Sequence, residues 1–135
     1  MPDKKLIYVS HSIRGKLGDK ATRETMQENN QAAMDFSHWL HEQFPDYKFY
    51  VPGEMDGYLW EHGVEPVQIV KGLLALDCSI IDISAGVLMF MPDEYMSSGM
   101  TVEHNHAVDM KIPVFRYNSN YITNEEIRQW LKGLA

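Results

Sequence analysis

The sequence contains little cysteine and little positive charge, and it has no long apolar run. Its single cysteine, Cys78, excludes a disulfide within the chain and fits a reducing compartment, so we expect a cytoplasmic protein. Lys and Arg number 12 against 19 Asp and Glu, an acidic balance that argues against binding to a nucleic-acid polymer. No apolar stretch approaches the length of a membrane span, and residues 1–5 do not resemble the start of a signal peptide. We therefore expect no membrane partner.

The remaining composition is that of a globular protein. The chain has 135 residues, of which 44% are hydrophobic and 23% charged. This length predicts one domain over residues 1–135, large enough to bury a continuous core.

Strand-like and helix-like segments alternate along the chain. Short apolar or β-branched runs predict strands at residues 6–10, 47–51, 86–91 and 112–117. Helical spacing or capping signals predict helices at residues 22–44, 66–82 and 99–110, and from residue 123 onward. Residues 11–21 suggest a loop, and residues 54–63 an irregular segment. This order predicts a single-domain α/β fold, a doubly wound (Rossmann- or flavodoxin-like) parallel sheet of about five strands with helices on both faces.

Three polar segments follow predicted strands: residues 11–15, 93–99 and 118–120. Ligands of doubly wound sheets bind at the carboxyl ends of the strands, so the chemistry is expected there. The first segment carries Ser12, Ile13, Arg14 and Gly15, a group suited to a phosphate but also compatible with an ordinary polar turn. Ser97 and Gly99 open a predicted helix, which suits an anion or an ordinary serine cap.

Two carboxylates are candidates for catalysis. Glu103 lies one helical turn inside the predicted helix, where it can attack an anomeric carbon or simply occupy the surface. Asp77 lies in an apolar helical run, so it either faces a cleft or marks an exposed stripe. Together they match the carboxylate pair used in glycosidic cleavage.

His104 and His106 are two residues apart on a helix and point in different directions, so we predict no metal and no other cofactor.

Three motifs in the same order resemble a known family. They are Ile7-Tyr8 followed by residues 12–15, Asp77 followed by residues 81–84, and Ser97-x-Gly99-x-x-x-Glu103. Together they resemble the nucleoside 2-deoxyribosyltransferase-like superfamily, and within it the (deoxy)nucleoside 5′-monophosphate N-glycosidases. The sequence departs from the family at His11 and Thr101, where glycines are usual.

The resemblance implies a function and a role for each matching residue. Glu103 would be the nucleophile at C1′, Asp77 would manage the proton of the departing base, and Tyr8 would line the pocket near the sugar. The 5′-phosphate would be held by Ser12, Ile13, Arg14, Gly15, Ser97 and Gly99. In the family's transferases an aspartate replaces the serine at position 97 and binds the sugar 5′-hydroxyl. The serine therefore favours a monophosphate hydrolase.

The resemblance also leaves alternatives. They are a non-catalytic nucleotide-binding or sensing domain, and a nucleoside deoxyribosyltransferase that exchanges bases. Family members are usually homodimers or larger homo-oligomers in which a neighbour's loop completes the site, and residues 118–120 are a candidate for that loop. Tyr8, Tyr58 and Trp60 are candidates for stacking on the base of the small-molecule nucleotide.

Overall fold

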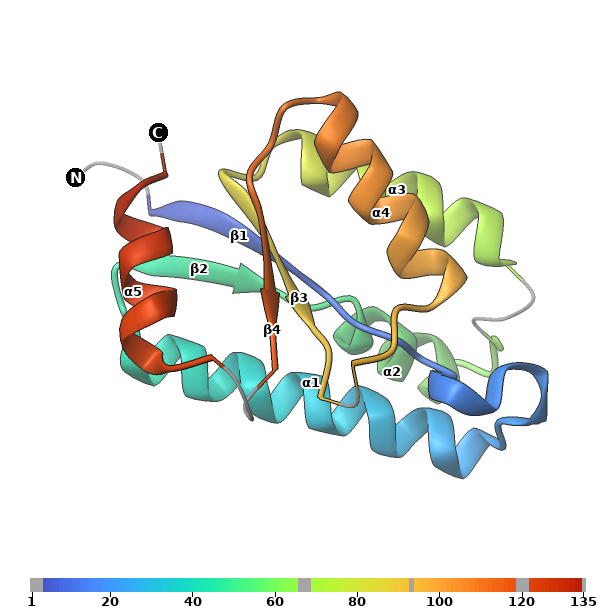
Figure 1. Ribbon diagram of the computed structural model, residues 1–135. Coiled ribbons are helices and arrows are strands. Elements are labelled where there is room, and N and C mark those ends of the chain that lie inside the picture. The colour runs from blue at the N-terminus through green and yellow to red at the C-terminus, as the bar shows by residue number, and fades with distance from the viewer. Residues whose placement is uncertain (1–3, 66–68, 93, 119–121, 135) are drawn as a thin grey trace.

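The computed structural model describes residues 4–65, 69–92, 94–118 and 122–134. Within them, the strands form one fully parallel sheet in the order β2-β1-β3-β4 (Figure 1). The strands are β1 (Lys5–Ser10), β2 (Tyr47–Tyr50), β3 (Gly86–Phe90) and β4 (Val114–Tyr117). Each lies where the sequence predicts a strand. The β-α alternation confirms the α/β class, and the arrangement is Rossmann-like.

Helices cover both faces of the sheet. They are α1 (Arg23–Gln43), α2 (Gly53–Glu61), α3 (Val70–Asp82), α4 (Ser98–Asp109) and α5 (Asn124–Lys132), with a 3-10 helix η1 (Gly15–Lys20) after β1. Helices α1 and α5 pack on one face around Leu40, Leu88 and Leu131. Helices α3 and α4 lie side by side on the other face around Ile81, Met89 and other apolar residues (Figure 1). Each face of the sheet therefore has its own apolar core.

The prediction of about five strands is wrong, because the described residues form four. After β4 the chain enters α5, which buries Ile127 and Leu131 against the α1 face of the sheet. A β-α-β unit takes about 30 residues or more. The residues after β2 form two successive helices, α2 and α3, before the next strand begins. The described residues between β2 and β3 therefore contribute two helices and no further strand.

The prediction of an irregular segment at residues 54–63 is also wrong. Helix α2 covers Gly53–Glu61, with Pro52 at its N-cap. The Pro52-Gly53 pair follows the strand predicted at residues 47–51 and suits the end of a strand, but the fixed φ of proline also suits the start of a helix. Glu54 and Asp56 in the first turn add favourable charge near the helix N-terminus.

The predicted helix starts are largely confirmed. The Thr22 side chain caps α1 by accepting from the Thr25 N–H at 3.1 Å, and the Thr123 side chain caps α5 by accepting from Glu126. Helix α1 ends before Pro45, as expected. Pro66, the first residue of the helix predicted at residues 66–82, lies outside the described residues. No helix among the described residues has the length and apolar character needed to cross a bilayer.

We expect Gly86→Ala to destabilise the fold, because the indole ring of Trp130 on α5 lies over this position in β3. An added Cβ would lie 2.8 Å from Trp130 Cη2, well inside normal carbon contact. The free energy of unfolding should fall by about 1–3 kcal/mol, measured by urea denaturation. In the control, Gly57→Ala in α2, the new Cβ meets nothing within 4 Å, and stability should rise by about 0.5–1 kcal/mol. Equal stability of Gly86→Ala and the unmodified protein would contradict the expectation.

Candidate active site

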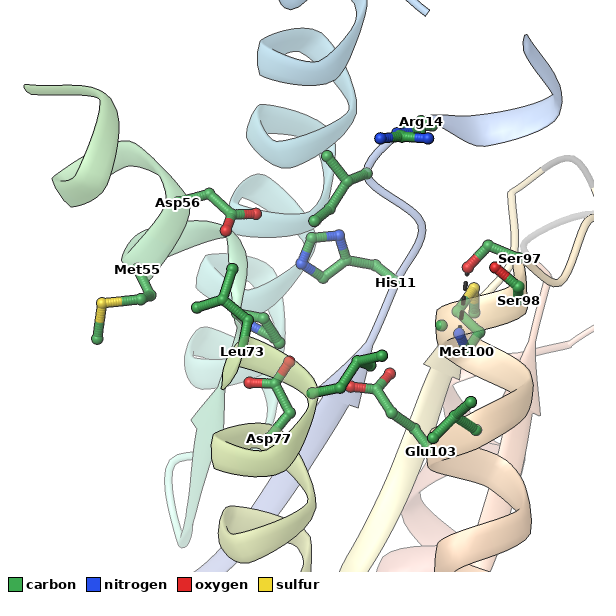
Figure 2. Close-up of a pocket in the computed structure, with 15 residues that line it drawn as sticks. His11, Arg14, Met55, Asp56, Leu73, Asp77, Ser97, Ser98, Met100 and Glu103 are labelled. Atoms are coloured by element: carbon green, nitrogen blue, oxygen red, sulfur yellow. Dashed lines mark hydrogen bonds between the residues drawn. The ribbon is translucent and has the colours of Figure 1, made fainter. Parts of the chain in front are cut away.

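A cavity of about 270 Å³ lies at the carboxyl edge of the sheet. This is the place where the strand order reverses between β1 and β3, the usual ligand crevice of such sheets. The walls come from the loop after β1, from α2, from α3 and from the first turns of α4 (Figure 2). The lining residues are His11, Ile13, Arg14, Pro52, Met55, Asp56, Leu73, Leu74, Asp77, Ser97, Ser98, Gly99, Met100, Val102 and Glu103. The size and the mixed lining suit a small molecule rather than a polymer.

The Glu103 side chain is buried at the cavity and fixed by two hydrogen bonds. It lies on α4 four residues after Gly99, so that the helix start and the carboxyl group share one face. The side chain is only 4% exposed. The Tyr8 hydroxyl donates to Glu103 Oε2, and Ser10 Oγ donates to Oε1 at 2.7 Å. Tyr8 and Ser10 are two residues apart in β1, so both point to the α4 side of the sheet.

Asp77 meets Glu103 from the neighbouring helix. It lies on α3, one turn after Leu73, and Figure 2 shows it in the cavity on the α3 side, across from Glu103 on α4. Burial raises the pKa of Glu103 to about 7 and that of Asp77 to about 6, against the lowering effect of the Tyr8 hydrogen bond. Both groups therefore keep a proton to a higher pH than an ordinary carboxyl group does, Glu103 more so than Asp77. A pair in which one group acts as a carboxylate and the other as an acid needs such a retained proton.

Tyr8 lies behind Glu103 rather than in the cavity wall. Its side chain is fully buried, and the residues that line the cavity do not include it. Burial and the charges of Glu103 and Asp77 raise the pKa of Tyr8 well above its ordinary value, so the hydroxyl keeps its proton and remains a donor. Tyr8 therefore donates to Glu103 from behind and does not line the cavity.

The N-terminus of α4 forms one end of the cavity. Ser97 caps the helix, its Oγ accepting from the Met100 N–H at 3.2 Å. Ser97, Ser98 and Gly99 all line the cavity, and Arg14 lines it from the loop after β1. Main-chain N–H groups of a first helical turn, hydroxyls and a guanidinium are ligands for an oxyanion.

Two of the predicted phosphate-binding residues shape the loop instead. Ser12 Oγ accepts from the Gly15 N–H at 2.7 Å, and Gly15 has φ +63°, a conformation that favours glycine. The side chain of Asn29 fixes the same loop by donating to the Ile13 carbonyl at 2.8 Å. Ser12 and Gly15 line a separate small hollow of about 50 Å³ and not the main cavity. Ile13 and Arg14 do line the main cavity.

His11 has a structural role that the sequence did not reveal. The ring is buried, and its Nε2 accepts from the Gly53 N–H at 3.0 Å. Because Nε2 accepts, the proton is on Nδ1, which faces the Ser12 carbonyl at 3.4 Å. Burial lowers the pKa of His11 to about 4, so the ring is neutral at physiological pH. It ties the loop after β1 to the start of α2, a contact that glycine at this position would not make.

Two further residues were missed from the sequence. Ser10, a donor to Glu103, had a usable signal: it lies two residues after Tyr8, on the same face of β1. Asp56 had none, because its helix was not predicted. It is 2% exposed, lines the cavity, and accepts from Asn30 Nδ2 at 3.2 Å. Burial raises the pKa of Asp56 to about 6.

The predicted stacking residues do not lie in the cavity. Tyr58 is 57% exposed and packs on His62, and Trp60 donates from Nε1 to Glu65 at 3.1 Å. Among the described residues, the lining contains no Tyr, Phe or Trp. Stacking on these rings is therefore not available to a ligand in this cavity, because α2 directs their side chains elsewhere.

Other predicted features have separate outcomes. In the described part of the chain, no three His, Cys, Asp or Glu side chains gather as a metal site. His106 instead pairs with Asp82 on α3, at 2.6 Å. Of the predicted donor loop, Ser119 and Asn120 lie outside the described residues.

The chain matches no protein-family model, no curated protein and no solved structure. The chemistry of the cavity is therefore inferred from its own side chains and their geometry.

Proposed function

We propose that the protein hydrolyses the N-glycosidic bond of a nucleoside 5′-monophosphate, giving free base and a sugar 5-phosphate. The observation that carries this proposal is the position of Glu103. It is buried at the cavity and accepts from two hydroxyl donors, burial and the charge of Asp77 raise its pKa, and the N-terminus of α4 lines the same cavity. A carboxylate nucleophile and a phosphate site in one small cavity suit a phosphorylated sugar.

The proposed mechanism proceeds in two steps. Glu103 Oε attacks C1′, the C1′–N bond breaks, and the departing base takes a proton from Asp77. Water then attacks C1′ of the glycosyl ester, gives its proton to Asp77, and releases the sugar with Glu103 restored as a carboxylate. Asp77 and Glu103 line the same cavity, and burial and the charge of Asp77 raise the pKa of Glu103, so the pair is close enough to act on one substrate.

Ser10 and Tyr8 contribute by favouring the ionised nucleophile. Their hydroxyls donate to different oxygens of Glu103, and donors stabilise the carboxylate over the acid. In the free protein Glu103 has the higher pKa of the two, so the proposed mechanism requires the proton to pass to Asp77 when the substrate binds. Both donors come from rigid β1, so the carboxylate is held in place before the substrate binds.

The phosphate assignment is tested at Ser97 with two variants of the same shape. Asp and Asn both cap helices well, so both variants should preserve α4. Ser97→Asp places a negative charge beside the bound phosphate, whereas Ser97→Asn does not. We expect Ser97→Asp to lower kcat/KM for a monophosphate by about tenfold to hundredfold relative to Ser97→Asn. Activity is measured as chromatographic release of free base.

The substrate panel contains ribo- and deoxynucleoside monophosphates and the matching nucleosides. Release from monophosphates, weakened by the Asp variant alone, is the expected result. Equal release from nucleosides and monophosphates would contradict the phosphate assignment, and no release from any substrate would contradict the hydrolase. Capture of the sugar by an added free base would instead identify a deoxyribosyltransferase.

A further inference from the structure

The cavity is electrically asymmetric, and the asymmetry orients a nucleotide. Ser97 and Ser98 lie on one side, with Arg14 above them, whereas Asp56 and Asp77 lie on the opposite side (Figure 2). A phosphate is attracted to the first side and repelled by the second. With the phosphate near α4 and C1′ at Glu103, the base extends toward α2. Pro52, Met55 and Asp56 line the cavity there.

Asp56 is the polar group of that α2 wall. Figure 2 shows its carboxylate directed from α2 toward the interior of the cavity. The hydrogen bond found for it is the one from Asn30 Nδ2, which engages Oδ2. Its pKa of about 6 leaves it ionised at neutral pH, and an ionised carboxylate only accepts hydrogen bonds. A buried carboxylate with one neutral donor gains from a second donor.

We propose that Asp56 is a specificity residue that selects bases carrying an exocyclic amino group over their keto counterparts. The inference rests on the proposed function for the orientation of the nucleotide. An amino group of cytosine or adenine donates an N–H to the carboxylate. A keto oxygen at the same place brings two acceptors together without a proton, so it loses the hydrogen bond and leaves the buried carboxylate with the Asn30 donor alone.

The test compares substrates that differ at this group: cytidine with uridine monophosphate, and adenosine with inosine monophosphate. For the unmodified protein, we expect kcat/KM to favour one or both amino bases over the keto partner by about tenfold to hundredfold. Asp56→Asn preserves the shape and supplies an N–H toward the keto oxygen, so the preference should fall to about one or invert. Met55→Ala is the matched control, because it shortens a neighbouring lining residue without changing a polar group. It should weaken both members of a pair equally.

Binding measurements separate this inference from the hydrolase proposal. The dissociation constants of the same nucleotides are measured by calorimetry on Glu103→Gln, with and without Asp56→Asn, after thermal unfolding has shown that each variant is folded. An amino preference in binding that depends on Asp56 supports the inference even if no base is ever released. Base release with no amino preference in the unmodified protein, or a preference that survives Asp56→Asn, would overturn the inference and leave the hydrolase standing.

Discussion

Glu103→Gln is expected to reduce the release of free base by about 10³-fold or more, the scale seen when a catalytic nucleophile is removed. The amide has nearly the same shape, and its one oxygen can accept from one of the two hydroxyls while its NH2 donates to the other, but it cannot form the glycosyl ester. Nucleotide binding should change only a few-fold, because the phosphate-binding end of the cavity is unaltered. Single-turnover release of base and calorimetric binding measure the two effects separately.

Glu42→Gln is the control for this substitution. Glu42 is exposed near the C-terminal end of α1, the end away from the cavity. The control should retain full activity. If Glu103→Gln released base at more than about a tenth of the unmodified rate, Glu103 would not be the nucleophile, and the N-glycosidase mechanism would fail. Loss of both release and binding would show instead that the substitution disturbs the cavity.

Glu103→Gln should also make the protein more stable at high pH. In the folded state the pKa of Glu103 is about 7, against 4.5 for the ordinary group. Between these two values the folded state binds more protons than the unfolded state, so the free energy of unfolding decreases as the pH rises. The loss is complete above about pH 7 and amounts to about 3 kcal/mol. Glutamine has no proton to lose, so the free energy of unfolding of the variant does not decrease in this way.

Urea denaturation at pH 4.5 and pH 8 tests this expectation. The stability difference between Glu103→Gln and the unmodified protein should grow by about 3 kcal/mol in favour of the variant over that range. For Glu42→Gln the difference should stay constant, because that side chain is exposed in both states. Parallel pH dependences for Glu103→Gln and the unmodified protein would mean that the Glu103 carboxyl is not desolvated in the folded state. A stable variant without activity would be the signature of a carboxylate retained for chemistry at the expense of stability.

The main elements of the fold could be predicted from the sequence. Buried parallel strands are short apolar runs, and helices show their apolar stripe and their capping residues, so these signals are local. Thr123 capped the expected helix, and the run at residues 86–91 formed the expected β3. The errors were also local in origin. The pair Pro52-Gly53 is compatible both with the end of a strand and with the start of a helix. The number of strands in the sheet cannot be predicted from any single segment.

The sequence by itself determined the α/β order, and it placed Glu103 one turn inside the helix whose start closes the cavity. Only the tertiary structure decided which side chains meet there. Glu103 comes from α4, Asp77 from α3 and Asp56 from α2, helices that are far apart in the chain but meet at the carboxyl edge of the sheet, and Tyr8 of β1 lies behind Glu103. Burial then set the protonation of these groups, since desolvation depends on every element packed around a carboxyl group and not on its neighbours in the chain.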